Sequence, residues 1–131
     1  MRWIKWLFYL AGIYGVLVLT PLYFKERALA EAGQPAITYP EFFYGFVGVA
    51  LAWQVAFLII GSDPTRFRPI ILAGIVEKLS FGIAAPILYV QQRVKADMLG
   101  AGFLDLVLGV LFMIAWVQLG KKPAASDIIA K

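Results

Sequence analysis

Long apolar runs alternate with short polar connections along this chain. The four runs, each nearly free of charged side chains, are residues 6–24, 42–62, 69–92 and 98–120. A helix needs about 20 mainly apolar residues to cross a bilayer. Apolar and polar residues do not alternate within these runs, as they do in the strands of a membrane barrel. The pattern predicts an all-α, four-transmembrane-helix bundle, with helices near residues 4–24, 40–61, 66–92 and 97–120.

Residues with strong helix-boundary preferences flank the second and third runs. Thr38 and Glu41 have the spacing of a capping box, in which the two residues hydrogen-bond to each other's backbone at a helix start. Asp63 and Pro64 resemble an N-cap followed by proline at the first helical position, so the third helix is expected to begin ahead of its apolar run. Pro86 lies inside the third run and is expected to kink that helix.

The connections and ends indicate a single membrane domain over residues 1–131. Residues 25–37 form the longest connection and are rich in alanine, which favours a short surface helix. Residues 121–131 form a polar tail. The first run is interpreted as an uncleaved helix, because it exceeds the usual 7–15 residues of a signal-peptide core and charged residues follow it directly.

Composition supports a location in a membrane. Of the 131 residues, 62% are hydrophobic and 15% charged, and the mean hydropathy is +0.81. Soluble domains are typically about 45–50% apolar and about 25% charged. The absence of cysteine and histidine excludes a thiol relay, a His-ligated haem, a Cys/His zinc site and a Ser-His-Asp triad. We therefore predict no metal site and no cofactor.

The distribution of positive charge predicts an orientation. Cytoplasmic ends of transmembrane helices carry an excess of Lys and Arg. With four crossings, one side holds Arg2, Lys5, Arg66, Arg68, Lys121, Lys122 and Lys131, and the other holds Lys25, Arg27, Arg93 and Lys95. We expect both termini in the cytoplasm and a bacterial cytoplasmic membrane. The net charge of +4 is explained by these helix ends, and no basic surface with interleaved aromatic residues points to nucleic acid.

Three charged residues interrupt the apolar runs. Glu77 and Lys78 lie in the third run and Asp105 in the fourth. A charge at the bilayer centre costs about 2.5–3.5 kcal/mol on insertion scales, and such residues usually face a bundle interior. Small residues, which let membrane helices approach closely, share their helix faces. These are Gly74, Gly82 and Ala85 beside Lys78, and Ala101, Gly102 and Gly109 beside Asp105. The spacing predicts an interior Lys78–Asp105 pair.

The remaining polar residues extend this cluster into a candidate binding site. We expect Glu77 to be directed towards Gln54 or Ser80, within a polar pocket between the second, third and fourth helices. The candidate ligand-binding residues are Glu77, Lys78, Asp105, Gln54, Glu41 and Ser80. Two carboxylates and one ammonium group sum to −1, so one carboxyl group is expected to be protonated near pH 7. The alternative is that the ion pair only fixes which helices meet.

Two short segments carry a resemblance to known families. Gly45-Phe46-Val47-Gly48 and Glu77-Lys78-Leu79-Ser80-Phe81-Gly82, together with four spans in about 130 residues, resemble the DoxX-like small four-helix membrane proteins. The plan is also similar to the emopamil-binding-protein type of four-helix fold, whose acidic residues hold a cationic sterol-like ligand or intermediate. This chain differs from an isomerase of that type because it contains no histidine.

Three functions remain open at this point. The first is a non-enzymatic membrane protein that binds a lipid or an amphipathic small molecule, or serves as an accessory subunit. The second is proton- or ion-coupled transport by an oligomer. The third is a membrane-embedded isomerase or lipid enzyme with Glu77 and Asp105 as acid and base. The expected partners are membrane lipids, a hydrophobic small molecule, and further copies or a larger membrane complex. Because the first is favoured, no residue is assigned a catalytic role.

Overall fold

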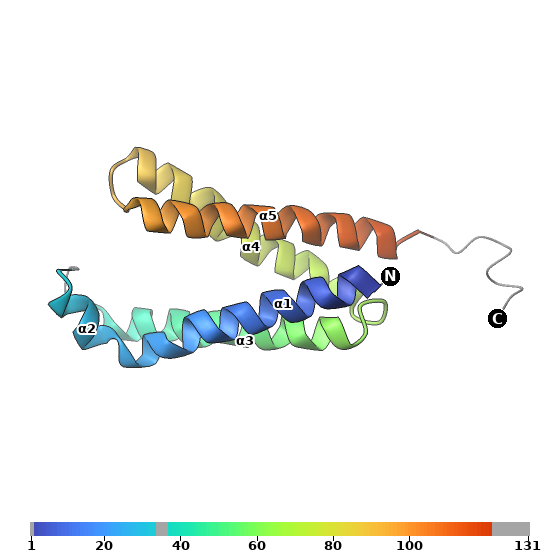
Figure 1. Cartoon of the computed structure of the whole chain (residues 1–131), viewed down its shortest axis with the longest axis horizontal. Coiled ribbons are helices and arrows are strands. Elements are labelled where there is room, and N and C mark those ends of the chain that lie inside the picture. The colour runs from blue at the N-terminus through green and yellow to red at the C-terminus, as the bar shows by residue number, and fades with distance from the viewer. Residues whose placement is uncertain (1, 34–36, 122–131) are drawn as a thin grey trace, which may run out of the picture. The chain divides into compact units, whose positions relative to one another are not determined.

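The computed structural model describes residues 2–33 and 37–121, and in these residues it contains helices and no strand (Figure 1). The elements are α1 (Arg2–Leu19), the 3-10 helix η1 (Thr20–Phe24), α2 (Glu26–Glu31), α3 (Pro40–Ser62), α4 (Arg68–Val90) and α5 (Ala96–Leu119). The all-α prediction with four long apolar helices is confirmed. The short helix expected in the longest connection is α2.

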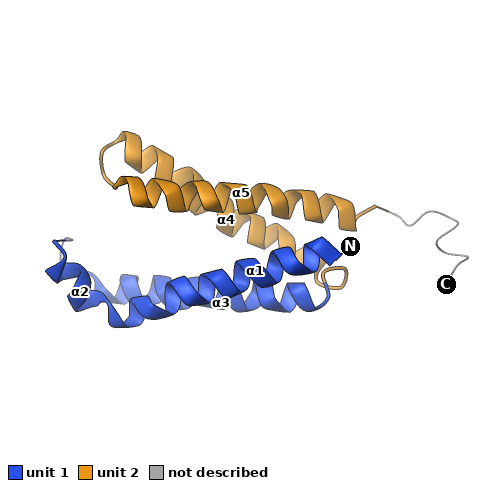
Figure 2. Ribbon diagram, in the orientation of Figure 1, with its two compact units in different colours: residues 1–63 blue, residues 64–131 orange. Residues whose placement is uncertain are grey.

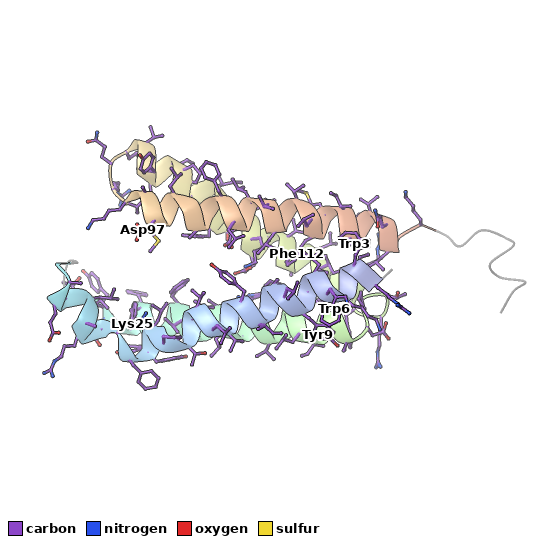
Figure 3. All side chains as sticks on the ribbon, viewed as in Figure 1. Trp3, Trp6, Tyr9, Lys25, Asp97 and Phe112 are labelled. Atoms are coloured by element: carbon purple, nitrogen blue, oxygen red, sulfur yellow. The ribbon has the colours of Figure 1, made fainter. Side chains whose placement is uncertain are left out.

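Four helical segments are long and apolar enough to cross a membrane. They are Arg2–Phe24, Pro40–Ser62, Arg68–Val90 and Ala96–Leu119. At about 1.5 Å per residue, a helix of this length covers the hydrocarbon core of about 30 Å. Large apolar side chains project outwards along the helices (Figure 3), and Leu17 is 69% exposed. Such extensive apolar exposure is typical of a surface that water does not cover. These features indicate an integral membrane protein.

The helices form two compact units, coloured separately in Figure 2. The first hairpin, Met1–Asp63, comprises α1, η1, α2 and α3, and α1 packs along α3. The second hairpin, Pro64–Lys131, comprises α4 and α5, which pack along each other. That the two hairpins form a single membrane domain stays a prediction.

Buried phenylalanines pack in the core of the first hairpin, and glycines let its two long helices approach closely. Phe8 and Phe57 are fully buried, with ring centroids 6.2 Å apart. The backbone of α1 approaches α3 closely at two glycines. A Cβ atom on Gly12 would lie 2.8 Å from the side chain of Leu58, and one on Gly15 would overlap the side chain of Gln54. The helices α1 and α3 can therefore approach this closely only because glycine has no side chain at these two positions.

The second hairpin is built on the small-residue faces that the spacing predicts. Gly74, Lys78, Gly82 and Ala85 are the buried small or charged residues of α4, and Gly102 and Gly109 are buried on α5. A Cβ atom on Gly102 would lie 2.5 Å from the Cβ atom of Ala85. One on Gly82 would lie 2.9 Å from the side chain of Leu106. At these points the side chain of one helix therefore packs directly against the glycine backbone of the other.

The expected capping box at the start of the second long helix is wrong. The residue before a proline is restricted to extended conformations, and Tyr39 before Pro40 has φ −125° and ψ 74°. The helix therefore starts at Pro40 with Tyr39 as its N-cap, and no side chain caps it. Thr38 lies one residue too far from the helix for this role. The same helix extends one residue past Gly61, to Ser62.

The third long helix begins later than expected. Residues 64–67 form a turn, and α4 starts at Arg68. A second proline, Pro69, explains the shift, because proline lacks the backbone N–H that a helix interior needs and is tolerated only in the first turn. Pro86 lies inside α4 without ending it, and its expected kink stays a prediction. Of the expected polar tail, residues 122–131 lie outside the described residues.

Candidate functional site

A lysine and two carboxyl groups meet in the second hairpin. Lys78 of α4 donates a hydrogen bond from Nζ to Asp105 Oδ1 of α5, at 3.4 Å. Glu77 Oε2 lies 3.5 Å from the same nitrogen. The Lys78 side chain is only 7% exposed, and those of Asp105 and Glu77 are 16% and 21% exposed. The structure thus places one ammonium group between two carboxyl groups; they form the charged cluster Glu77–Lys78–Asp105.

Glycine on the facing helix makes room for the lysine stem. A Cβ atom on Gly109 would lie 2.9 Å from the side chain of Leu79 and 3.5 Å from the Cβ atom of Lys78. The α5 backbone therefore comes close enough for the four-carbon stem of Lys78 to reach Asp105, one helical turn before Gly109 along α5. A larger residue at position 109 would separate the two helices at the level of the cluster.

The cluster lies near the middle of both helices. Lys78 follows the α4 start at Arg68 by about 15 Å, and Asp105 follows the α5 start at Ala96 by about 14 Å, at about 1.5 Å per residue. Both positions fall close to the centre of a hydrocarbon core about 30 Å thick. If these helices cross a membrane, the three groups lie at a depth where unpaired charges are costly.

Glu77 keeps an unused acceptor within this cluster. Its Oε2 atom is buried and accepts no hydrogen bond, although Lys78 Nζ lies 3.5 Å away. At 3.5 Å, the contact between Lys78 Nζ and Glu77 Oε2 is an ion pair rather than a directed hydrogen bond. A buried acceptor without a partner costs free energy, so a group that donates to it gains more than it would in water. The cluster can therefore accept a hydrogen bond from a bound molecule.

Ser80, Gln54 and Glu41 are the three remaining candidate residues. Ser80 Oγ donates to the main-chain oxygen of Glu77, at 2.8 Å, and the Glu77 carboxylate faces Lys78 instead. Gln54 belongs to the first hairpin, where its Nε2 donates to the Ala50 main-chain oxygen at 2.9 Å. Glu41 is exposed in the first turn of α3. The expectation that Glu77 turns to Ser80 is therefore wrong.

Gln54 resembles Glu77 in one respect. It is 2% exposed, and its Oε1 atom is buried without a hydrogen-bond partner. It packs against Gly15, where any side chain on α1 would overlap it. Each hairpin thus carries a buried polar side chain beside a glycine of the partner helix. The pocket expected between the second, third and fourth helices draws on both hairpins and stays a prediction.

Arg68, at the start of α4, binds the end of α5, and the sequence analysis did not predict this contact. Arg68 Nε donates to the Trp116 main-chain oxygen at 2.9 Å, and its guanidinium carbon lies 4.1 Å from the centroid of the Trp116 ring. The last carbonyls of a helix lack partners within it, so this bond satisfies one of them. Gly120 leaves the space for the guanidinium group. One indication of this contact was present in the sequence. Arg68 directly precedes the third apolar run and Trp116 lies near the end of the fourth, so both fall at the same end of two antiparallel helices.

A second missed arrangement lies in the first hairpin. Tyr44 Oη of α3 donates to Glu26 Oε2 of α2, at 2.6 Å. The rings of Tyr23 and Tyr44 stack with centroids 6.1 Å apart and an interplanar angle of 18°. Sequence position alone marks these tyrosines as interfacial aromatic residues. Only the fold shows that the two rings stack on each other and that Tyr44 donates to the Glu26 carboxylate.

Among residues 2–33 and 37–121, no group of three or more His, Cys, Asp or Glu side chains could hold a metal ion. Comparisons with protein-family models, curated proteins and solved structures found no match to this chain. The geometry of the two hairpins therefore carries the functional argument.

Proposed function

We propose that this small membrane protein binds an amphipathic small molecule or lipid at the Glu77–Lys78–Asp105 cluster of the second hairpin, without catalysing a reaction on it. The unsatisfied Glu77 Oε2 atom carries this proposal. A hydroxyl or amine of the ligand donates to the carboxyl group of Glu77, whose side chain is 21% exposed although Oε2 itself is buried. The exposed apolar side chains of α4 contact the hydrocarbon part of the ligand.

The partly exposed cluster gives such a ligand access. The Glu77 side chain retains 21% exposure, whereas the amine of Lys78 is nearly enclosed. The neighbouring outward residues Val76 and Phe81 are exposed and apolar. A molecule with one polar group on an apolar body matches this combination, because buried polar groups are stable only when hydrogen-bonded.

Native mass spectrometry of the gently purified protein tests the proposal. We expect a co-purified lipid or small molecule on the parent chain and its loss in Glu77→Leu, which removes the acceptor. Glu41→Leu is the matched control, because Glu41 is an exposed carboxylate at the start of α3. Equal retention of the same molecule in both variants would contradict binding at the cluster.

Proton- or ion-coupled transport by an oligomer is the second candidate. The observation that favours it is that two carboxyl groups lie within 3.5 Å of the Lys78 nitrogen, near the middle of two apolar helices. Ionisable residues inside membranes commonly mark proton or ion paths. Proton flux in liposomes that disappears in Glu77→Gln and persists in Glu41→Gln would favour this function over simple ligand binding.

A further inference from the structure

A groove at one end of the first hairpin combines aromatic, charged and apolar walls. Its volume is about 460 Å³, and its lining residues are Tyr23, Phe24, Glu26, Arg27, Ala30, Ile37 and Tyr44. Small-molecule sites are typically about 300–1,000 Å³. The groove is formed where η1 ends, α2 follows, and the second turn of α3 passes beside them. Its lining residues all belong to the first hairpin, whereas the charged cluster belongs to the second.

The groove lies at the level of a membrane surface if α1 and α3 cross. The span Arg2–Phe24 ends at the groove, and the span Pro40–Ser62 begins beside it. Phe24 is 84% exposed and Tyr39, one residue before α3, is 64% exposed. Tyrosine and other amphipathic aromatic residues concentrate at headgroup level. A lipid headgroup is therefore the molecule that this groove meets first.

The charged residues of the groove, Glu26 and Arg27, have opposite signs. Tyr44 Oη holds the Glu26 carboxylate at 2.6 Å, at the edge of the stacked Tyr23–Tyr44 pair. A carboxylate has about four acceptor positions, so the bond to Tyr44 leaves others for a ligand. Aromatic faces attract cations, and a guanidinium group recognises phosphate. Arg27 follows Glu26 directly in the chain and is exposed.

We propose that this groove binds the headgroup of a zwitterionic phospholipid, with its phosphate at Arg27 and its ammonium group at Glu26 beside Tyr23 and Tyr44. Phe24, Ala30 and Ile37 contact the glycerol and the first carbons of the acyl chains. An anionic headgroup without an amine would bring its charge towards the Glu26 carboxylate. A simple cation would gain nothing from Arg27. A ligand with both charges satisfies both residues.

Lipid titrations of the full-length protein in detergent micelles, followed by native mass spectrometry, test this proposal. The probes are phosphatidylethanolamine and phosphatidylglycerol with identical short acyl chains. We expect phosphatidylethanolamine to bind about tenfold more tightly, which corresponds to about 1.4 kcal/mol. Glu26→Gln should abolish this preference, whereas Arg27→Gln should weaken the binding of both lipids, because both carry the phosphate. Tyr23→Leu, which changes no charge, should weaken phosphatidylethanolamine binding.

Two matched controls lie in the same segment. Lys25→Gln and Glu31→Gln make the same charge changes at residues outside the groove lining, and both should retain the preference. Circular dichroism verifies that each variant stays helical. An equal effect of the controls and the groove variants would overturn the proposal, because it would show a general response to charge.

Soluble competitors distinguish the headgroup from its parts. Phosphoethanolamine should displace the bound lipid, whereas inorganic phosphate at the same concentration should not. Displacement by phosphate alone, or equal binding of both lipids by the parent protein, would overturn the assignment of the ammonium group to Glu26 and the tyrosines.

Discussion

Lys78 is the most deeply buried of the described charged residues in the second hairpin. Its amine is nearly enclosed and lies 3.4 Å from Asp105 Oδ1 and 3.5 Å from Glu77 Oε2. Separating one partner from a buried charge group leaves the others uncompensated, which costs about 3–5 kcal/mol. The cluster therefore ties α4 to α5 whether or not a ligand binds there.

Replacement of Lys78 by methionine should destabilise the protein. In Lys78→Met two carboxyl groups lose the ammonium group between them, and we expect the free energy of unfolding to fall by about 2–4 kcal/mol. Unfolding of the purified protein in mixed micelles, followed by circular dichroism, measures the change. Lys78→Met with Asp105→Asn should recover part of the loss. Lys121→Met is the control, since Lys121 is exposed beyond the end of α5. Equal stability of Lys78→Met and the control would contradict a structural role of the cluster.

A polar side chain also makes a close contact in the first hairpin. Gln54 fills the space in front of Gly15, so Gly15→Ala should be destabilising by about 1–3 kcal/mol through overpacking. Gly45→Ala is the matched control, because nothing lies within 4 Å of a Cβ atom at that position.

A double-mutant cycle identifies the clashing partner. Gln54→Ala shortens the side chain that Gly15→Ala would meet, and it also removes the buried oxygen that has no hydrogen-bond partner. We therefore expect the two substitutions together to be more stable than the sum of their separate effects, by about 0.5–3 kcal/mol. Strict additivity in the same unfolding measurements would show that Gln54 does not limit the approach of α1.

At the scale of elements, glycines on one helix determine how closely its neighbour packs. In membranes, packing and hydrogen bonds replace the hydrophobic effect as the force between helices. Gly82 and Gly102 each bring a backbone against the facing helix, at Leu106 and Ala85. The helices themselves form because the alternative, a backbone without internal hydrogen bonds, is not stable in lipid.

Two nearby glycines of α5 provide a sharp test of this packing. A Cβ atom on Gly102 would lie 2.5 Å from Ala85 Cβ, whereas one on Gly100 has no neighbour within 4 Å. Gly102→Val should therefore destabilise the second hairpin by about 1–3 kcal/mol, and Gly100→Val should have little effect. Thermal unfolding in micelles compares the two variants. Similar melting temperatures would mean that α4 and α5 do not pack as the structure describes.

At the scale of the whole molecule, four crossings determine which connections share a side. Residues near Thr65 and Lys121 should lie on one side of the membrane, and residues near Glu31 and Gln91 on the other. Because the chain contains no cysteine, single substitutions to cysteine report accessibility without background. Thr65→Cys and Lys121→Cys should react with a membrane-impermeant reagent only from the cytoplasm. Glu31→Cys and Gln91→Cys should react only from outside.

The labelling pattern separates two claims. A reversed pattern, with Thr65→Cys labelled from outside, would overturn the orientation inferred from the distribution of Lys and Arg and leave four crossings intact. Labelling of Glu31→Cys and Thr65→Cys from the same side would contradict a crossing by α3.

The four long apolar helices were predictable from the sequence, whereas the 3-10 turn at Thr20–Phe24 was not. Runs of about 20 apolar residues have one stable form in lipid, and the small residues beside Lys78 and Asp105 recur at helical spacing. The helix starts were less predictable. The conformation of Tyr39 before Pro40 prevents Thr38 from capping α3, and Pro69 requires α4 to start after the expected cap at Asp63.

Most contacts between side chains were visible only in the tertiary structure. The sequence left Glu77 to face Gln54 or Ser80, and the structure places its carboxylate 3.5 Å from Lys78 Nζ instead. The bond from Arg68 to Trp116 joins residues 48 positions apart, and that from Tyr44 to Glu26 joins residues 18 apart. Periodicity places a residue on a face of its own helix, but contacts between elements follow from packing, which no local pattern encodes.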